Sequence, residues 1–283
     1  MKRLLVIAGS DSSGGAGIQA DLKTAQSFGV YAQTAITAVT VQNTLGVTGV
    51  HGVPPEIVRE QIIACLSDIG ADAIKTGMLG SAAMVEMVAA TLEEHAPGIP
   101  LVVDPVMVAK GGSRLIDSDA VTALKKRLLP LSTLLTPNLP EAEVLTGILP
   151  VSEHRIRNAA MVSKMLRCDS VLFKGGHAFP PLRPSYLGGA TATSPIGADR
   201  VGEGSETVRD MLWHDGEFLP FEARRQHTIH THGTGCTMAT AIACGLAQGR
   251  GMVEAVARAH SYVQSAIRTA PGLGRGHGPL NHG

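Results

Sequence analysis

The sequence of 283 residues has little of several features that mark particular classes of protein. It has no charge excess, because 24 Lys and Arg balance 24 Asp and Glu, whereas nucleic-acid-binding proteins carry a basic surplus or a basic stripe. Only 3% of the residues are aromatic, but 44% are hydrophobic, which excludes intrinsic disorder. No apolar run approaches the roughly 20 residues of a membrane-spanning helix. We therefore expect a globular protein that binds neither nucleic acid nor a membrane.

Cysteine is also scarce. The four cysteines lack the paired spacing of a metal site and are too few for a disulfide framework in a chain of this length. Two cations and an apolar stretch open the chain as in a signal peptide, but residues 9–11 (GSD) interrupt the stretch early and no small-residue cleavage site follows. These features predict a reduced, cytoplasmic location.

Apolar runs of strand length alternate with segments of helical period. Strands are predicted at residues 4–9, 31–41, 47–53, 72–76, 101–104, 133–136, 170–174, 207–213 and 217–221. Helices are predicted at residues 15–28, 55–69, 82–95, 118–129, 140–145, 152–167, 235–248 and 252–269. This alternation predicts a single three-layer α/β/α domain over residues 1–283, with a mostly parallel central sheet covered by helices on both faces. Residues 178–206 are rich in Pro, Gly and Ser without periodicity, and are predicted to be a loop insertion within this domain.

Polar residues and glycines follow several predicted strands directly, among them Asp11, Gly77, Asp104 and Asn138. In a parallel sheet, ligands bind beyond the carboxyl ends of the strands, where these residues would meet. Strand ends carry polar residues in any fold, however, so their position alone does not distinguish a site from ordinary surface.

The segment THGTGCT at residues 231–237 runs straight into a predicted helix. Gly233 and Gly235 allow unusual backbone angles, and a helix N-terminus offers free amides and partial positive charge to a phosphate group. A cysteine at this position, Cys236, also has a reason for a lowered pKa. The alternative is a tight turn with a buried, inert cysteine. His232 nearby raises a third interpretation, a cysteine–histidine nucleophile.

Two glycine-rich or capping motifs allow both structural and functional interpretations. The segment GSDSSGGAGIQAD at residues 9–21 matches neither a dinucleotide-binding fingerprint nor a Walker motif, but its backbone can approach a small flat ligand, with Asp21 as a polar handle. In TPNLPE at residues 136–141, Asn138 and Glu141 form a helix capping box or place a carboxylate that holds Mg²⁺ through water.

Two further segments supply charge near the same predicted edge of the sheet. Lys174 ends a strand and is followed by two glycines, which suits nucleotide phosphates. Asp104 and Lys110, in the segment 103–112, supply one acid and one mobile base.

The chain resembles the ribokinase-like superfamily and, more closely, the hydroxymethylpyrimidine/phosphomethylpyrimidine kinase family of thiamine biosynthesis. The segments that carry the resemblance span the whole chain in the family's order: AGSDSSGGAGIQAD (8–21), VQNT (41–44), KTGML (75–79), DPVM (104–107), TPNLPE (136–141), KGGH (174–177), THGTGCT (231–237) and GHGPLNH (276–282). One departure is the stretch 178–206, which is longer than the family pattern leads us to expect.

The resemblance implies ATP-dependent phosphorylation of 4-amino-5-hydroxymethyl-2-methylpyrimidine and then of its monophosphate. It also implies that Mg²⁺ takes part, that a monovalent cation can bind, and that the protein forms a homodimer. It assigns Gln42, Asp21, Gly9, Ala16 and Met78 to the pyrimidine pocket. It assigns Cys236, with Gly233 and Gly235, to catalysis. It assigns Lys174, Thr234 and Asn138 to ATP and its phosphates, and Glu141 to Mg²⁺. From their own segment we also expect Lys110 to contact the phosphates and Asp104 to contribute to the Mg²⁺ site.

Three other functions stay open from the sequence. A pyridoxal kinase of the same superfamily is the nearest, and Gln42 discriminates against it by offering a donor and an acceptor to an aminopyrimidine edge. A hydrolase or acyltransferase would use Cys236 and His232 without ATP. A regulatory protein would bind ATP without turnover.

Overall fold

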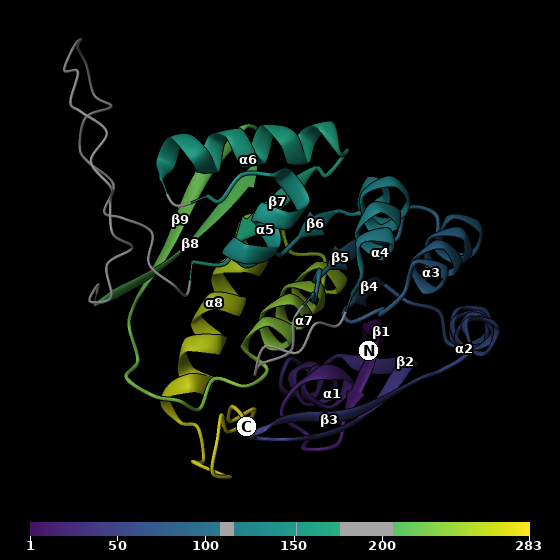
Figure 1. The fold of residues 1–283 in the computed structure, drawn as a ribbon, viewed down its shortest axis with the longest axis horizontal. Helices are drawn as coiled ribbons and strands as arrows, with labels where there is room; N and C mark the ends of the chain where they lie inside the picture. The colour runs from purple at the N-terminus through teal and green to yellow at the C-terminus, as the bar shows by residue number, and fades with distance from the viewer. Residues whose placement is uncertain (108–115, 151, 176–205) are drawn as a thin grey trace.

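A single sheet runs through the part of the chain that the computed structural model describes, residues 1–107, 116–150, 152–175 and 206–283 (Figure 1). Within these residues the sheet has nine strands in the order β3-β2-β1-β4-β5-β6-β7-β8-β9. The strands are β1 (Arg3–Asp11), β2 (Tyr31–Asn43), β3 (Gly46–Gly52), β4 (Ala73–Thr76), β5 (Leu101–Val103), β6 (Leu134–Leu135), β7 (Ser170–Phe173), β8 (Thr207–His214) and β9 (Glu217–Arg224). From β2 to β7 all neighbouring pairs are parallel, and β3, β8 and β9 are antiparallel additions at the two edges.

Helices cover both faces of this sheet. They are α1 (Gly17–Ser27), α2 (Pro55–Asp68), α3 (Ala82–His95), α4 (Ser118–Ala123), α5 (Leu139–Thr146), α6 (Glu153–Met165), α7 (Thr234–Ala247) and α8 (Met252–Arg268). Buried side chains of α1, α7 and α8 share one apolar cluster with the sheet, and those of α2 to α6 share the other. The predicted three-layer α/β/α architecture with a mostly parallel sheet is confirmed.

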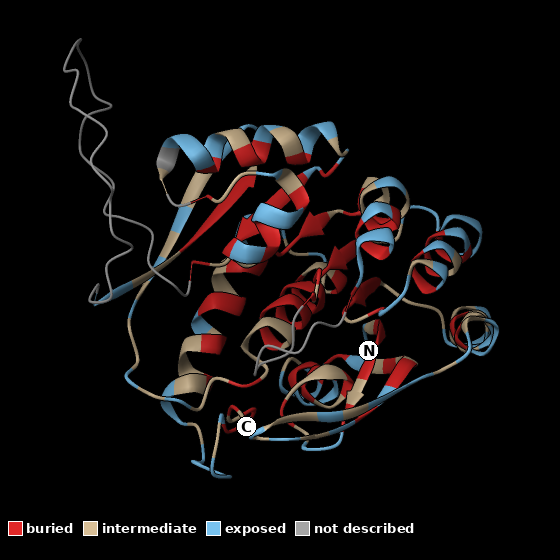
Figure 2. Cartoon of the chain, in the orientation of Figure 1, coloured by how far each residue is buried: buried red, intermediate tan, exposed pale blue. Residues whose placement is uncertain are grey.

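The first strand shows why the sequence folds into layers. Successive side chains of a strand point to opposite faces, and both faces of a central parallel strand are buried. Leu4, Val6 and Ala8 accordingly pack toward α1, α7 and α8, whereas Leu5 and Ile7 pack toward the opposite helices. Figure 2 shows the resulting buried centre of the molecule.

One predicted helix winds differently from the expectation. Residues 118–129 form α4 only as far as Ala123, followed by a π-helical segment at Leu124–Leu128 and a 3₁₀ turn, Leu129–Leu131. Pro130 lies in that turn and has no N–H with which to continue an α-helix. The predicted insertion at residues 178–206 lies outside the described residues except for Glu206.

The carboxyl ends of β1, β4, β5, β6 and β7 meet at one edge of the sheet. The turns that follow them therefore converge, and α7 begins at the same edge, because its first residues lie against the ends of β5 and β7. None of the described helices is both long and apolar enough to cross a membrane.

Candidate active site

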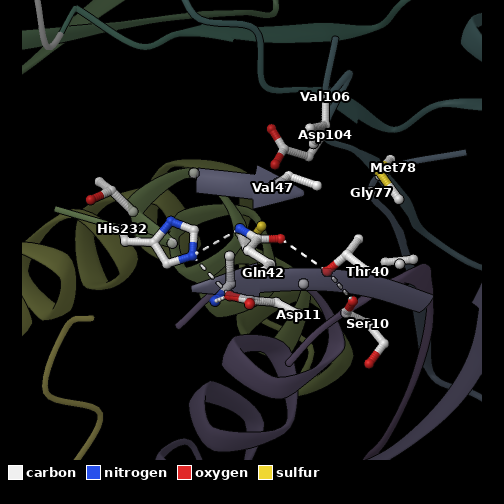
Figure 3. Close-up of a pocket in the computed structure, with 18 of the residues that line it drawn as sticks. Ser10, Asp11, Thr40, Gln42, Val47, Gly77, Met78, Asp104, Val106 and His232 are labelled. Atoms are coloured by element: carbon white, nitrogen blue, oxygen red, sulfur yellow. Dashed lines mark hydrogen bonds and ion pairs between the residues drawn. The ribbon is translucent and has the colours of Figure 1, made fainter. Parts of the chain in front are cut away.

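A cavity with a volume of about 240 Å³ opens at this edge of the sheet (Figure 3). Its wall combines the glycine-rich turn after β1, the end of β2, the turn after β4 and the first turn of α7. Nearly all the residues that the sequence predicted as site residues line it, namely Gly9, Ala16, Gln42, Met78, Asp104, Asn138, Glu141, Lys174, Gly233, Thr234, Gly235 and Cys236. Of the other two, Lys110 lies outside the described residues and Asp21 lies behind the wall.

The start of α7 is built around Gly233, which is the N-cap and has a left-handed backbone with φ +86°. A side chain there would overlap the carbonyl oxygen of Gly15, so the turn after β1 and the start of α7 are in backbone contact. Because glycine has no side chain to cap the helix, the first amides of α7 keep their capacity to bind an anion. A β-carbon on Gly235 would lie 3.2 Å from Lys174 Nζ, which places the lysine beside that anion site.

Lys174 is held in position by Asp104. Its Nζ lies 2.7 Å from Asp104 Oδ1, which also accepts a hydrogen bond from the Thr136 hydroxyl at 3.1 Å. Burial alone would lower the pKa of Lys174, but Asp104 and Glu141 outweigh it and raise the pKa. The lysine is therefore a cation at neutral pH, aimed at the open helix end.

Asn138 and Glu141 form the predicted capping box at the start of α5, and both also line the cavity. Asn138 Oδ1 accepts from the Glu141 amide at 2.9 Å, and Glu141 Oε2 accepts from the Asn138 amide at 2.8 Å. Burial raises the pKa of Glu141 from 4.5 to about 7, with Asp104 adding to the rise and Lys174 opposing it. The structural and the functional interpretation of this motif are therefore compatible.

This raised pKa predicts how stability depends on pH. The folded chain keeps a proton on Glu141 that the unfolded chain releases above about pH 4.5, so the free energy of unfolding decreases as pH rises from there to about 7. Glu141→Gln keeps the capping box but carries no charge, and we expect it to flatten that decrease. At about pH 8 the variant should melt a few degrees higher than the wild type in thermal unfolding followed by circular dichroism.

The matched control is Glu143→Gln, an exposed position on the same helix, which should keep the wild-type pH dependence. If Glu141→Gln also kept it, another group would be responsible for the titration.

The charge state of Cys236 differs from the expectation. Burial raises its pKa from 9.0 to about 11, with Asp21 and Asp104 adding to the rise and Lys75 opposing it. The lowered pKa predicted from the helix N-terminus is therefore wrong for the free protein, because burial and two nearby carboxylates together outweigh the opposing charge of Lys75. At neutral pH the side chain at the start of α7 is a thiol.

Asp21 forms a fully buried ion pair with Lys75. The Lys75 Nζ lies 2.9 and 3.0 Å from the two carboxylate oxygens, and the Thr240 hydroxyl donates to Asp21 Oδ1 at 2.6 Å. Burial alone would lower the pKa of Lys75, but Asp21, Cys236 and Asp104 outweigh it and hold the pKa above its usual range. Lys75 lines the cavity and Asp21 does not. The polar contact with a ligand that was expected from Asp21 would therefore come from Lys75.

The contacts of His232 do not support the cysteine–histidine nucleophile that was considered from the sequence. Its Nε2 lies 2.8 Å from Asp11 Oδ2 and 3.2 Å from the Gln42 amide nitrogen, as Figure 3 shows. The sequence patterns placed Asp11 only among the polar strand-end residues and gave no binding role to Thr40 or Lys75, although all three line the cavity. For Lys75 a signal existed, because a lysine inside a short, buried parallel strand requires a carboxylate partner.

An open helix end and a paired lysine suit a phosphate group, and the cavity beside them is of small-molecule size. The fold and the site thus define a phosphotransferase that acts on a small molecule. A family model described as phosphomethylpyrimidine kinase matches residues 11–281. The chain belongs to the phosphomethylpyrimidine kinase family.

Individual relatives agree with this membership. The chain is similar to the thiamine biosynthesis bifunctional protein ThiED of Geobacter sulfurreducens, with 49% identity over 99% of this chain and 52% of that protein, so it spans about half of the relative's length. It is 42% identical to the hydroxymethylpyrimidine/phosphomethylpyrimidine kinase of Haemophilus influenzae, over 100% of this chain and 97% of the relative. The structure of Staphylococcus aureus pyridoxal kinase in complex with AMP-PCP and pyridoxal is similar with a TM-score of 0.83 and 33% identity, covering 100% of this chain and 94% of that one.

Proposed function

We propose that this chain transfers the γ-phosphoryl group of ATP to the hydroxyl of 4-amino-5-hydroxymethyl-2-methylpyrimidine and then to the monophosphate so formed. The observation that carries the proposal is that Gln42 and the open start of α7 line one cavity. An amide offers one donor and one acceptor to the edge of an aminopyrimidine, and a helix N-terminus binds phosphate. One cavity can therefore hold acceptor and phosphoryl group together.

Phosphoryl transfer depends mainly on positioning and on neutralising negative charge. The amides at the start of α7 and the Lys174 ammonium lie beside one another, and both are suited to bind the phosphoryl group that is transferred. The ammonium of Lys75 also lies at the cavity wall, where the Asp21 carboxylate balances its charge. AMP-PCP, bound in the complex of the similar pyridoxal kinase, is an ATP analogue, which supports ATP as the phosphoryl donor.

The donor set fits Mg²⁺ bound together with a nucleotide. Among the described residues, no group of three or more His, Cys, Asp or Glu is placed to hold a metal by itself. Mg²⁺ on nucleotides needs only one or two protein carboxylates, because phosphates and waters supply the other ligands. Glu141 and Asp104 would provide them, and the bound ion would neutralise phosphate charge.

The two acceptors make different demands on the site. The alcohol must lose a proton as it is phosphorylated, and Cys236 is the proposed base, acting once its own proton has left. The monophosphate offers an oxygen that is largely ionised at neutral pH, so it needs charge screening from Lys174 and the α7 amides more than a base.

Gly233→Ala tests the helix start. The new β-carbon would overlap the Gly15 carbonyl and would also sit at an unfavourable φ of +86°, so the first turn of α7 must shift. We expect a fall in melting temperature and at least about a tenfold loss of ATP affinity, because displaced amides bind phosphate poorly. Differential scanning fluorimetry with and without ATP-Mg²⁺ measures both.

Gly249→Ala is the matched control. Gly249 has a similar φ of +79°, but no atom lies within 4 Å of the added β-carbon, so only the backbone cost remains. Equal losses of ATP affinity in the two variants would contradict the assigned role of Gly233.

Mass spectrometry of the products tests the proposed function directly. The full chain is incubated with ATP-Mg²⁺ and equal amounts of hydroxymethylpyrimidine and pyridoxal. The expected result is one and then two phosphate mass increments on the pyrimidine. Phosphorylation confined to pyridoxal would favour the related kinase, to which the structural similarity also extends. No ATP-dependent mass increment on either acceptor would overturn the proposal.

A homodimer, a monovalent-cation requirement and a cytoplasmic location stay predictions. The hydrolase alternative loses its geometric basis, because His232 Nε2 contacts Asp11 and Gln42, and Cys236 is a thiol.

A further inference from the structure

Asp11 is an anchored carboxylate at the end of β1. Its Oδ1 accepts hydrogen bonds from the Ser13 amide and hydroxyl, both at 2.8 Å, and its Oδ2 accepts from the Ala16 amide at 2.8 Å and the Gly15 amide at 3.2 Å. A carboxylate with this many donors stays ionised and can only accept hydrogen bonds.

The proton position on His232 follows from this anchor. Its Nε2 lies 2.8 Å from Asp11 Oδ2, so that nitrogen carries a hydrogen and donates it. His232 is 5% exposed, and its backbone amide donates to the Gly278 carbonyl at 3.1 Å, which ties the loop before α7 to the C-terminal segment. The imidazole therefore has a single Nε2 hydrogen in a fixed position, and Asp11 Oδ2 is its nearest acceptor.

Gln42 is the next group in this chain of contacts. Its amide nitrogen is placed 3.2 Å from His232 Nε2, and its oxygen 3.1 Å from Thr40 Oγ1 (Figure 3). The Thr40 hydroxyl has one hydrogen, which it donates to the Ser10 carbonyl at 2.8 Å. In this orientation a donor faces a donor at His232 and an acceptor faces an acceptor at Thr40.

A half-turn of the Gln42 amide removes both conflicts. The oxygen then lies beside the single Nε2 hydrogen of His232, which it shares as a second acceptor with Asp11 Oδ2, and the nitrogen donates to Thr40 Oγ1; only the oxygen and nitrogen exchange places. We propose that His232, oriented by Asp11, is a positioning residue that fixes the Gln42 amide with its oxygen on the His232 side and its nitrogen on the Thr40 side.

The direction of this amide sets which ligand edge it recognises. With one lone pair directed toward His232 and one N–H toward Thr40, Gln42 keeps one lone pair and one N–H for a ligand in the cavity that it lines. They match a ligand edge on which an amino group adjoins a ring nitrogen, and they match it in one direction only. A 4-aminopyrimidine has such an edge, whereas pyridoxal does not. This inference rests on the proposed function and names the device by which that function selects its substrate.

Calorimetric titration of the full chain with two ligands tests it. The ligands are 4-amino-5-hydroxymethyl-2-methylpyrimidine and the same compound without the amino group. We expect the wild type to bind the amino compound at least about tenfold more tightly, since a hydrogen-bonded pair is lost without it. His232→Leu should bring the two affinities to within about twofold, mainly by weakening the amino compound.

His232→Gln is the rescue variant, because its amide can place a donor near the position of Nε2, and it should retain most of the preference. A merely structural role of His232 would weaken both ligands equally and leave the ratio unchanged, which would overturn the inference. A wild type that binds neither ligand would instead overturn the proposed function.

A second measurement does not depend on the leucine variant folding. In long-range ¹H–¹⁵N spectra of the ¹⁵N-histidine-labelled protein, the signal lost in His232→Gln should show a protonated Nε2. An unprotonated Nε2 would overturn the inference.

Discussion

Replacing Cys236 by alanine is expected to slow phosphorylation of hydroxymethylpyrimidine by on the order of 10²- to 10⁴-fold, the usual contribution of a positioned base. Phosphorylation of the monophosphate should fall by less than about tenfold, because its oxygen needs no base. The wild-type alcohol step should also accelerate as pH rises, since the thiol pKa of about 11 leaves little thiolate at neutral pH. Single-turnover rates for each acceptor across a pH series measure both effects.

Cys244→Ala is the matched control for this experiment. Cys244 lies on the same helix, fully buried among apolar side chains, and its loss should leave the ratio of the two rates unchanged. If Cys236→Ala slowed both phosphorylation steps equally, Cys236 would not be the base. It would then only help to position the substrates.

Lys75→Met should reduce the free energy of unfolding by about 3–5 kcal/mol. The substitution leaves the Asp21 carboxylate buried without its cation, and both side chains of the pair are fully inaccessible to solvent. Methionine fills a similar volume, so the loss arises from the unpaired charge rather than from a cavity. Chemical denaturation at neutral pH measures the effect.

The double variant Lys75→Met/Asp21→Asn separates charge from packing. Asparagine keeps an acceptor for the Thr240 hydroxyl and removes the stranded charge, so it should recover more than half of the lost stability. Lys2→Met, which breaks an exposed pair with Asp72, is the surface control and should change stability little. If Lys75→Met reduced the free energy of unfolding no more than Lys2→Met does, the buried ion pair would not be important for stability.

The lining of the site was largely predictable because the motif segments resemble those of a known family and several of them follow strands of a parallel sheet, whose carboxyl ends meet at one edge. Gln42 ends β2 and Cys236 begins α7, far apart in the chain, and both line the cavity as expected. Asp21 was expected to touch the substrate because it lies near the start of α1. Its burial behind Lys75 depends on the register between α1 and β4, which local sequence patterns do not specify.

The helix at residues 118–129 shows a second limit of sequence patterns. Its apolar period predicted the position of the segment, but not its change to π and 3₁₀ winding before Pro130. Winding near a proline depends on which carbonyls the surrounding structure leaves to be satisfied.

The sequence by itself determined the three-layer architecture and the residue types around the cavity, because hydrophobic period and strand-end chemistry are local properties of the chain. Only the tertiary structure decided the charge on Cys236, the partner of Asp21 and the direction of the Gln42 amide. A pKa or a hydrogen-bond direction depends on burial and on charges from distant segments, and these acquire definite values only when the segments pack together.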